Sequence, residues 1–306
     1  MEEKETGGLG EADLSRKGQE EISQDGGMAK KPLFTMRELL EAGVHFGHRT
    51  MRWNAKMAPY IYGTRSKIHI IDLTQTAILM TESMRILKEI VRKRGRILFV
   101  CTKKQGAESV RNLAEEVGQF YVVHKWLGGM LTNWKTVSQS IKKIKMIESQ
   151  LSDRNSKILK KEQVVLNKTL EKLTNNLNGI RTMGNLPDLL FVFDVLKESL
   201  AVNEARALGI PIMAIVDTNS NPDVVDYPIP GNDDSIKAIQ LYCRIIADTL
   251  RDIKLPKPKP ELPTRRSGGR SARVESVEGF DGFLAGGAAV GDGADFAVPE
   301  EHGGTE

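Results

Sequence analysis

Apolar residues along the chain form short runs that are separated by helix-like periods. Five runs of four or five mostly apolar residues lie at 68–71, 97–101, 120–123, 189–193 and 212–216. Strands of this kind, when helices separate them, indicate a parallel sheet with both faces covered. The pattern therefore predicts an α/β fold around a five-stranded parallel sheet.

The intervening segments show helical signals. Thr35 and Glu38 form a capping-box pattern, which predicts a short helix that ends at Gly43. After the first strand, apolar positions recur every three or four residues from Ala77 to Val91, as on one face of a helix. Further helices are predicted at 107–117, 199–208 and 235–253.

No strand is predicted between Asn133 and about Ile180, where the hydrophobic period changes. Apolar positions step by three or four on both sides of a polar break at 152–156, which predicts two helices folded back as an antiparallel coiled-coil hairpin. The insertion covers about 133–181 and falls between the third and fourth predicted strands. The expected seam is Val137, Ile141, Ile144, Ile147 and Leu151 on the first helix, and Leu166, Leu170, Leu173, Leu177 and Ile180 on the second.

Charge is distributed unevenly along the chain. The net charge is +4, but residues 1–27 hold 3 Lys and Arg against 8 Asp and Glu, and 28–254 hold 35 against 23. The hairpin segment 135–181 holds 11 against 4. A basic body suggests a polyanionic partner such as nucleic acid, and the alternative is an ordinary solvated lysine-rich surface. The hairpin is either an arm for RNA or a partner protein, or simply a solvated helix pair.

Composition also predicts the organisation of the chain and its compartment. Residues 1–32 form an acidic extension and 255–306 a Pro/Gly/Ala-rich tail, and both are expected to be disordered around a folded domain at 33–254. We expect no membrane span, because no apolar run approaches the roughly 20 residues required. The two cysteines, 101 and 243, offer no disulfide framework, and no signal peptide is expected. The sequence thus indicates a soluble protein of a reducing compartment.

A basic loop follows the second predicted strand. Lys103 and Lys104 precede a helix, where free N–H groups and the helix dipole favour a phosphate. The chain lacks both the Gly-x-Gly-x-x-Gly and the P-loop patterns, however, so a nucleotide-dependent enzyme on a doubly wound scaffold is the weaker alternative. A phosphate of a nucleic-acid backbone fits the loop equally well.

Two candidate metal motifs are incomplete. Asp217, Asn219 and Asn221 match alternate ligands of an EF-hand loop, but prolines stand at the turning and chelating positions. Asx turns and helix caps are therefore the favoured interpretation, with Mg²⁺ left open for the acidic region 217–234. His45 and His48 have no third ligand nearby, so zinc is disfavoured. No catalytic motif is present, and we expect neither a cofactor nor an enzyme.

Cations and aromatic residues interleave between Val44 and Met57. Arg and Lys neutralise phosphates, whereas Phe46 or Trp53 could stack on an unpaired base or pack beneath the loop. We expect nucleic-acid contact from the basic residues and core packing from the aromatic ones.

Several long motifs give the chain a family resemblance over residues 33–254. They are GVHFGH at 43–48, WNAKM at 53–57, IIDL at 70–73, WLGGMLTNW at 126–134, LPD at 186–188, VDTN at 216–219 and DYPIPGNDD at 226–234. These motifs and their order resemble the bacterial small-subunit ribosomal protein S-two family. The resemblance implies a flavodoxin-like three-layer α/β/α domain with an inserted coiled-coil hairpin, and it implies no catalysis.

The same resemblance implies partners and contact residues. Family members lie on the small subunit, contact its 16S ribosomal RNA and neighbouring ribosomal proteins, and dock ribosomal protein S-one. We therefore expect a cytoplasmic protein of the small ribosomal subunit that is not a homo-oligomer. The residues expected on the RNA side are Arg49, Arg52, Trp53, Asn54, Lys56, Lys103, Lys104, Lys125, Trp126 and Asn133.

Overall fold

The structure is a computed structural model that describes residues 32–153, 159–251 and 253. The described residues all belong to one compact unit of the chain, Met1–Lys257. The disorder predicted for 1–32 and 255–306 falls outside the described residues, apart from Pro32. Within the described ranges, no helix is both long and apolar enough to cross a bilayer.

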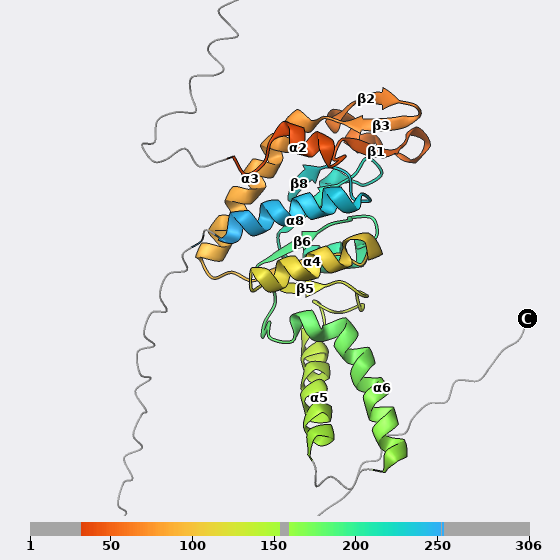
Figure 1. The fold of residues 1–306 in the computed structure, drawn as a ribbon, viewed down its shortest axis with the longest axis vertical. Helices are drawn as coiled ribbons and strands as arrows, with labels where there is room; N and C mark the ends of the chain where they lie inside the picture. The colour runs from red at the N-terminus through yellow and green to blue at the C-terminus, as the bar shows by residue number, and fades with distance from the viewer. Residues whose placement is uncertain (1–31, 154–158, 252, 254–306) are drawn as a thin grey trace, which may run out of the picture. The chain divides into compact units, whose positions relative to one another are not determined.

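A five-stranded parallel sheet lies at the centre of the fold, as predicted (Figure 1). Its strand order is β5-β4-β6-β7-β8. Every residue of the three central strands is buried, which explains why these strands read as unbroken apolar runs. The strands are β4 (Ile97–Val100), β5 (Phe120–Val122), β6 (Leu189–Val192), β7 (Ile212–Val216) and β8 (Tyr227–Pro230).

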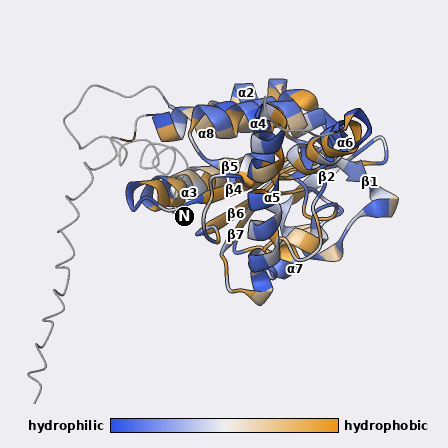
Figure 2. Ribbon diagram, turned by 90° about the horizontal axis from the view of Figure 1, so that it is seen from below, coloured by the Kyte–Doolittle hydropathy of each residue, from blue (hydrophilic) through white to orange (hydrophobic). Residues whose placement is uncertain are grey.

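Helices cover both faces of this sheet and produce two hydrophobic clusters. Phe99 of β4 packs in the cluster that holds residues of α2, α3, α4 and α8, and its neighbour Leu98 packs in the cluster with α5, α6 and α7. Figure 2 shows hydrophobic strands between helices whose outer faces are hydrophilic. The helix bounds are α2 Met36–Glu41, α3 Leu73–Arg92, α4 Lys104–Glu116, α5 Trp134–Ser152, α6 Lys160–Leu177, α7 Ser199–Ala207 and α8 Ile236–Arg251.

The predicted capping box is confirmed. The Thr35 hydroxyl accepts a hydrogen bond from the Glu38 N–H at 3.2 Å, and the Glu38 carboxylate accepts one from the Thr35 N–H at 2.8 Å. After the helix, Gly43 has a φ of +77°, a conformation that glycine adopts without a Cβ penalty. The short helix therefore begins and ends where the sequence indicates.

The membership of the parallel sheet differs from the prediction in one strand. The run at 68–71 forms β3 (Ile68–Ile71), which pairs antiparallel with β1 (Phe46–Arg49) and β2 (Ile61–Arg65) in a separate three-stranded sheet. The fifth parallel strand is instead β8, which the sequence analysis missed because it contains Pro228 and Pro230. Proline cannot donate to a ladder, but an edge strand tolerates it.

Helices α5 and α6 occupy the predicted insertion, between β5 and β6, and lie side by side (Figure 1). Ile144 and Leu177 of the expected seam are buried, and the Arg181 guanidinium, which follows α6 in the chain, pairs with the Glu148 carboxylate of α5. Two antiparallel helices are thus present, while coiled-coil packing along their full length stays a prediction.

Candidate nucleic-acid interface

At the carboxyl ends of the parallel strands, the largely buried Lys103 lies among carboxylates. Lys103 follows β4, and its Nζ lies 2.8 Å from Asp194 Oδ2, 2.8 Å from Asp233 Oδ1 and 2.7 Å from Asp234 Oδ1. Only 13 % of the Lys103 side chain is exposed. Lys103 was expected on the RNA side; in the structure its ammonium group is paired with three carboxylates, and RNA contact by this residue stays a prediction.

The charges at the carboxyl ends of the parallel strands disfavour binding of a phosphate there. Burial, together with the charges of Asp217 and Asp194, raises the pKa of Asp233 to about 8. Burial opposes the charge on Lys103, but the surrounding carboxylates outweigh it and raise the pKa of the ammonium group. A nucleotide phosphate at this edge would meet several carboxylates and a lysine that is already paired. The arrangement gives no support to the nucleotide-enzyme alternative.

His48 connects the small antiparallel sheet to the acidic edge, the group of carboxylates Asp194, Asp217, Asp233 and Asp234 at the carboxyl ends of the parallel strands. Its Nδ1 lies 3.1 Å from Asp217 Oδ2 and its Nε2 lies 3.3 Å from Asp234 Oδ2, and the contact with Asp217 raises the pKa of the imidazole. The ligand atoms of His48, Asp217 and Asp233 lie within 4.8 Å of one another, so these three residues could hold a divalent cation.

The acidic loops are ordered by local hydrogen bonds, which confirms the Asx-turn and helix-cap prediction. Asn232 Oδ1 accepts from the N–H groups of Asp234 at 2.9 Å and Ser235 at 3.2 Å. Asn221 Oδ1 accepts from the Asp223 N–H at 3.0 Å and caps a short 3₁₀ helix. These side chains stabilise the loops through hydrogen bonds to backbone N–H groups.

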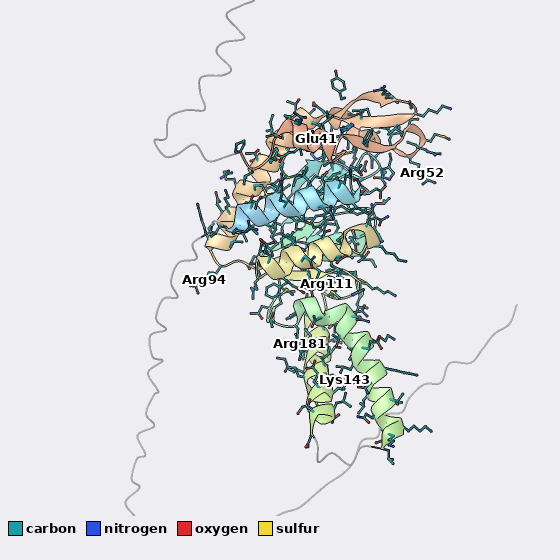
Figure 3. All side chains as sticks on the ribbon, viewed as in Figure 1. Glu41, Arg52, Arg94, Arg111, Lys143 and Arg181 are labelled. Carbon is teal, nitrogen blue, oxygen red and sulfur yellow. The ribbon has the colours of Figure 1, made fainter. Side chains whose placement is uncertain are left out.

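The basic stretch after β1 lies on the surface. Arg49 ends β1 and Arg52 ends the following 3₁₀ helix, and both are exposed; Figure 3 shows Arg52 at the margin of the small sheet. Lys56 is also exposed, and its Nζ pairs with the Asp223 carboxylate. Asn54 is half-buried and caps the next helix through the Lys56 N–H at 3.0 Å. Trp53 is 44 % exposed, with its ring centroid 5.2 Å from that of His69.

The candidate residues in the loop between β5 and α5 differ in their exposure to solvent. Lys125 and Asn133 are exposed at its two ends, whereas Trp126 is only 6 % exposed. The Trp126 indole N–H donates to Glu204 at 3.0 Å. In the structure Trp126 packs inside the protein, and its direct contact with RNA stays a prediction. Lys104, beside Lys103, is exposed and remains available.

Sequence reasoning missed Glu204, which organises this loop. Its partners lie 72 to 78 positions away along the chain, so no local motif points to the contact. The only signal in the sequence was the glycine-containing motif at 126–134, whose backbone N–H groups require a hydrogen-bond acceptor.

The hairpin offers a second basic surface. Its helices direct their buried residues toward each other and toward the domain, which leaves the lysines outside; Figure 3 labels Lys143 on α5. The exposed lysines are Lys135, Lys142, Lys143 and Lys145 on α5, and Lys160, Lys161, Lys168 and Lys172 on α6.

The fold and these surfaces define a class: a three-layer, flavodoxin-like α/β protein with an inserted basic helical hairpin. A family model described as "Ribosomal protein S2" matches residues 39–252. The chain therefore belongs to the ribosomal protein S2 family, whose members are structural ribosomal proteins and not enzymes.

Curated relatives agree with this family. The chain is 54 % identical to "Small ribosomal subunit protein uS2" of Rhodospirillum centenum over 222 residues, which cover 72 % of this chain and 85 % of the relative. It is also 54 % identical to the protein of the same name from Ruegeria over 221 residues, 72 % of this chain and 86 % of the relative. Both alignments leave the remaining 28 % of this chain unmatched.

Proposed function

We propose that this chain binds the 16S RNA of the small ribosomal subunit through two basic surfaces. The first, the β1 surface, consists of Arg49, Arg52 and Lys56; the second is the lysine-bearing hairpin. The observation that best supports the proposal is that their cations are exposed, whereas the lysine of the acidic edge is buried and paired. Exposed cations that are not held in buried ion pairs can neutralise RNA phosphates, and this neutralisation supplies most of the affinity for RNA.

The remaining candidates supply a smaller share of the proposed contact. Lys104, Lys125 and Asn133 are exposed and can reach RNA, and Trp53 is open enough for one ring face to stack. Asn54 acts through the helix that it caps, which presents Lys56.

Neighbouring small-subunit proteins are the other proposed partners, and ribosomal protein S-one is among them. The acidic edge is the favoured docking region for protein, because the exposed Asp234 carboxylate repels RNA phosphates. A cavity of about 360 Å³ lies where this edge meets the β1 surface, because its lining combines Asp217 and Asp234 with Arg49 and Arg52. The chain acts as one copy per small subunit in the cytoplasm, not as a homo-oligomer.

The test is salt-dependent binding of the full chain to purified 16S RNA. Replacing Arg49, Arg52 and Lys56 together by Ala should weaken binding and lower the slope of log affinity against log salt by about two to three, if each cation contacts one phosphate. The matched control replaces Arg85, Arg92 and Lys93 of the α3 region by Ala, an equal loss of charge elsewhere. An unchanged slope in the first variant, or an equal fall in both, would contradict the proposed β1 surface.

A further inference from the structure

Glu204 of α7 accepts five hydrogen bonds from a single loop. Its Oε1 accepts from the Trp126 indole N–H at 3.0 Å and the Gly129 N–H at 2.8 Å. Its Oε2 accepts from the Leu131 N–H at 2.9 Å, and from the N–H and hydroxyl of Thr132 at 3.1 and 3.2 Å. Both carboxylate oxygens are therefore fully used by donors of the segment 126–132.

These donors keep the carboxylate charged. Burial by itself would favour the neutral acid, but the hydrogen bonds from Trp126 and the loop backbone outweigh it and hold the pKa of Glu204 below its usual value. Hydrogen bonds to an ionised acceptor are about twice as strong as neutral ones. The Glu204 carboxylate thus holds the loop in place by accepting hydrogen bonds from its backbone N–H groups, in the way that a bound anion is held by a nest of N–H donors.

The loop is also held by its own buried side chains, Trp126, Met130 and Leu131, and Glu204 fixes the backbone between them. Gly129 has a φ of +82°, which turns the chain so that its N–H and that of Leu131 can face one carboxylate. Lys125 precedes the anchored segment and Asn133 follows it, and both side chains are exposed. The direction in which these two residues point is therefore set by the loop between them.

We propose that Glu204 is a positioning residue for RNA binding: it holds the 126–132 loop so that Lys125 and Asn133 meet the RNA together. This inference rests on the proposed RNA-binding function. Glu204 itself touches no RNA, because all of its acceptor capacity faces the loop. Its contribution is pre-organisation, which lowers the conformational entropy lost when the loop is bound.

Glu204→Gln tests the proposal in the full chain with purified 16S RNA. The amide keeps the side-chain shape but replaces one acceptor oxygen by an NH₂ group that would face N–H donors. Binding should weaken by about tenfold, the effect of losing one or two charge-assisted hydrogen bonds. Removal of a negative charge would by itself tighten RNA binding, so the expected change has the opposite sign to the simple electrostatic one.

The matched control is Glu82→Gln, the same charge change at an exposed position of α3. If Glu204→Gln lowers the folded fraction, Thr132→Val provides a milder variant, because it removes only the hydroxyl donor and leaves the backbone N–H in place. That variant should weaken binding by about twofold to threefold.

A double-mutant cycle separates positioning from general stability. Lys125→Ala should weaken RNA binding in the wild-type background and have little further effect in the Glu204→Gln background, because a misplaced Lys125 contributes little. Equal effects of Lys125→Ala in the two folded backgrounds would show that Glu204 is merely structural and would overturn the inference. Binding of Glu204→Gln equal to that of Glu82→Gln would overturn it as well.

The two proposals fail in different ways. Absence of wild-type binding to 16S RNA contradicts the proposed function, and this inference falls with it. Wild-type binding with a normal salt slope, combined with an unaffected Glu204→Gln variant, contradicts the role of Glu204 alone.

Discussion

The ammonium group of Lys103 lies 2.8 Å from the carboxylate of Asp194, and both side chains are almost completely removed from solvent. The neighbouring Lys104 is exposed at the start of α4. Two adjacent lysines of one basic loop therefore have different tasks. Lys103 neutralises the acidic edge of the parallel sheet, and Lys104 remains available to a partner.

Replacing each lysine by Ala should separate these tasks. Lys103→Ala leaves the buried Asp194 carboxylate without its counter-charge, and it should lower the free energy of unfolding by about 3 kcal/mol, as for other broken buried pairs. Lys104→Ala should stay within about 0.5 kcal/mol of the wild type. Urea denaturation measures both values. Equal stabilities of the two variants would show that the buried ion pairs contribute nothing.

Gly179 should not tolerate a side chain. A Cβ at this position would clash with the carbonyl oxygen of Tyr121, where the base of the hairpin meets β5. Gly179→Ala should therefore destabilise the protein by about 1–3 kcal/mol through overpacking. Gly63→Ala is the control, since nothing lies within 4 Å of its Cβ position, and its melting temperature should match the wild type. A wild-type melting temperature for Gly179→Ala would contradict the close approach of hairpin and strand.

The hairpin seam can be tested with two apolar residues of α5. Ile144 is completely buried, whereas Met146 is 62 % exposed. Ile144→Ala should lower the free energy of unfolding by about 2–5 kcal/mol, and Met146→Ala should change it by less than about 0.5 kcal/mol. Chemical denaturation gives both numbers. A reversed order would mean that the hairpin packs through another face.

Glu204 should add a specific pH dependence to stability. Its pKa is lower in the folded state than in the unfolded chain, so its stabilising effect is complete above the unfolded pKa and is lost as the pH falls through the folded value. The wild type should therefore exceed Glu204→Gln in stability near about pH 7, and the difference should shrink as the pH falls through the lowered pKa of Glu204 in the folded state. Denaturation curves across this range test the expectation. A constant difference between the two proteins would exclude ionisation of Glu204 as the cause.

Most of the fold could be predicted because local signals agreed with the final packing. The fully buried strands β4, β6 and β7 appear in the sequence as apolar runs, and the capping box at Thr35 fixes the start of α2. The error concerned β3 and β8. Periodicity identifies β3 as a strand but not its partners, which depend on chain path, and the prolines of β8 conceal an edge strand.

The candidate site was less predictable because its function depends on distant contacts. The sequence places Lys103 and Trp126 in basic or aromatic motifs, yet one meets Asp233 across 130 positions and the other meets Glu204 across 78. Chemistry alone indicates that a lysine or a tryptophan can bind RNA. Only the fold determines whether that side chain is already occupied by the protein.

The most direct test of the ribosomal role is sedimentation of the tagged full chain from a bacterial lysate on sucrose gradients at low and moderate salt. We predict co-migration with small subunits that persists in moderate salt and weakens when Arg49, Arg52 and Lys56 are replaced together by Ala. A chain that remains at the top of the gradient at both salt concentrations would contradict its incorporation into the small subunit.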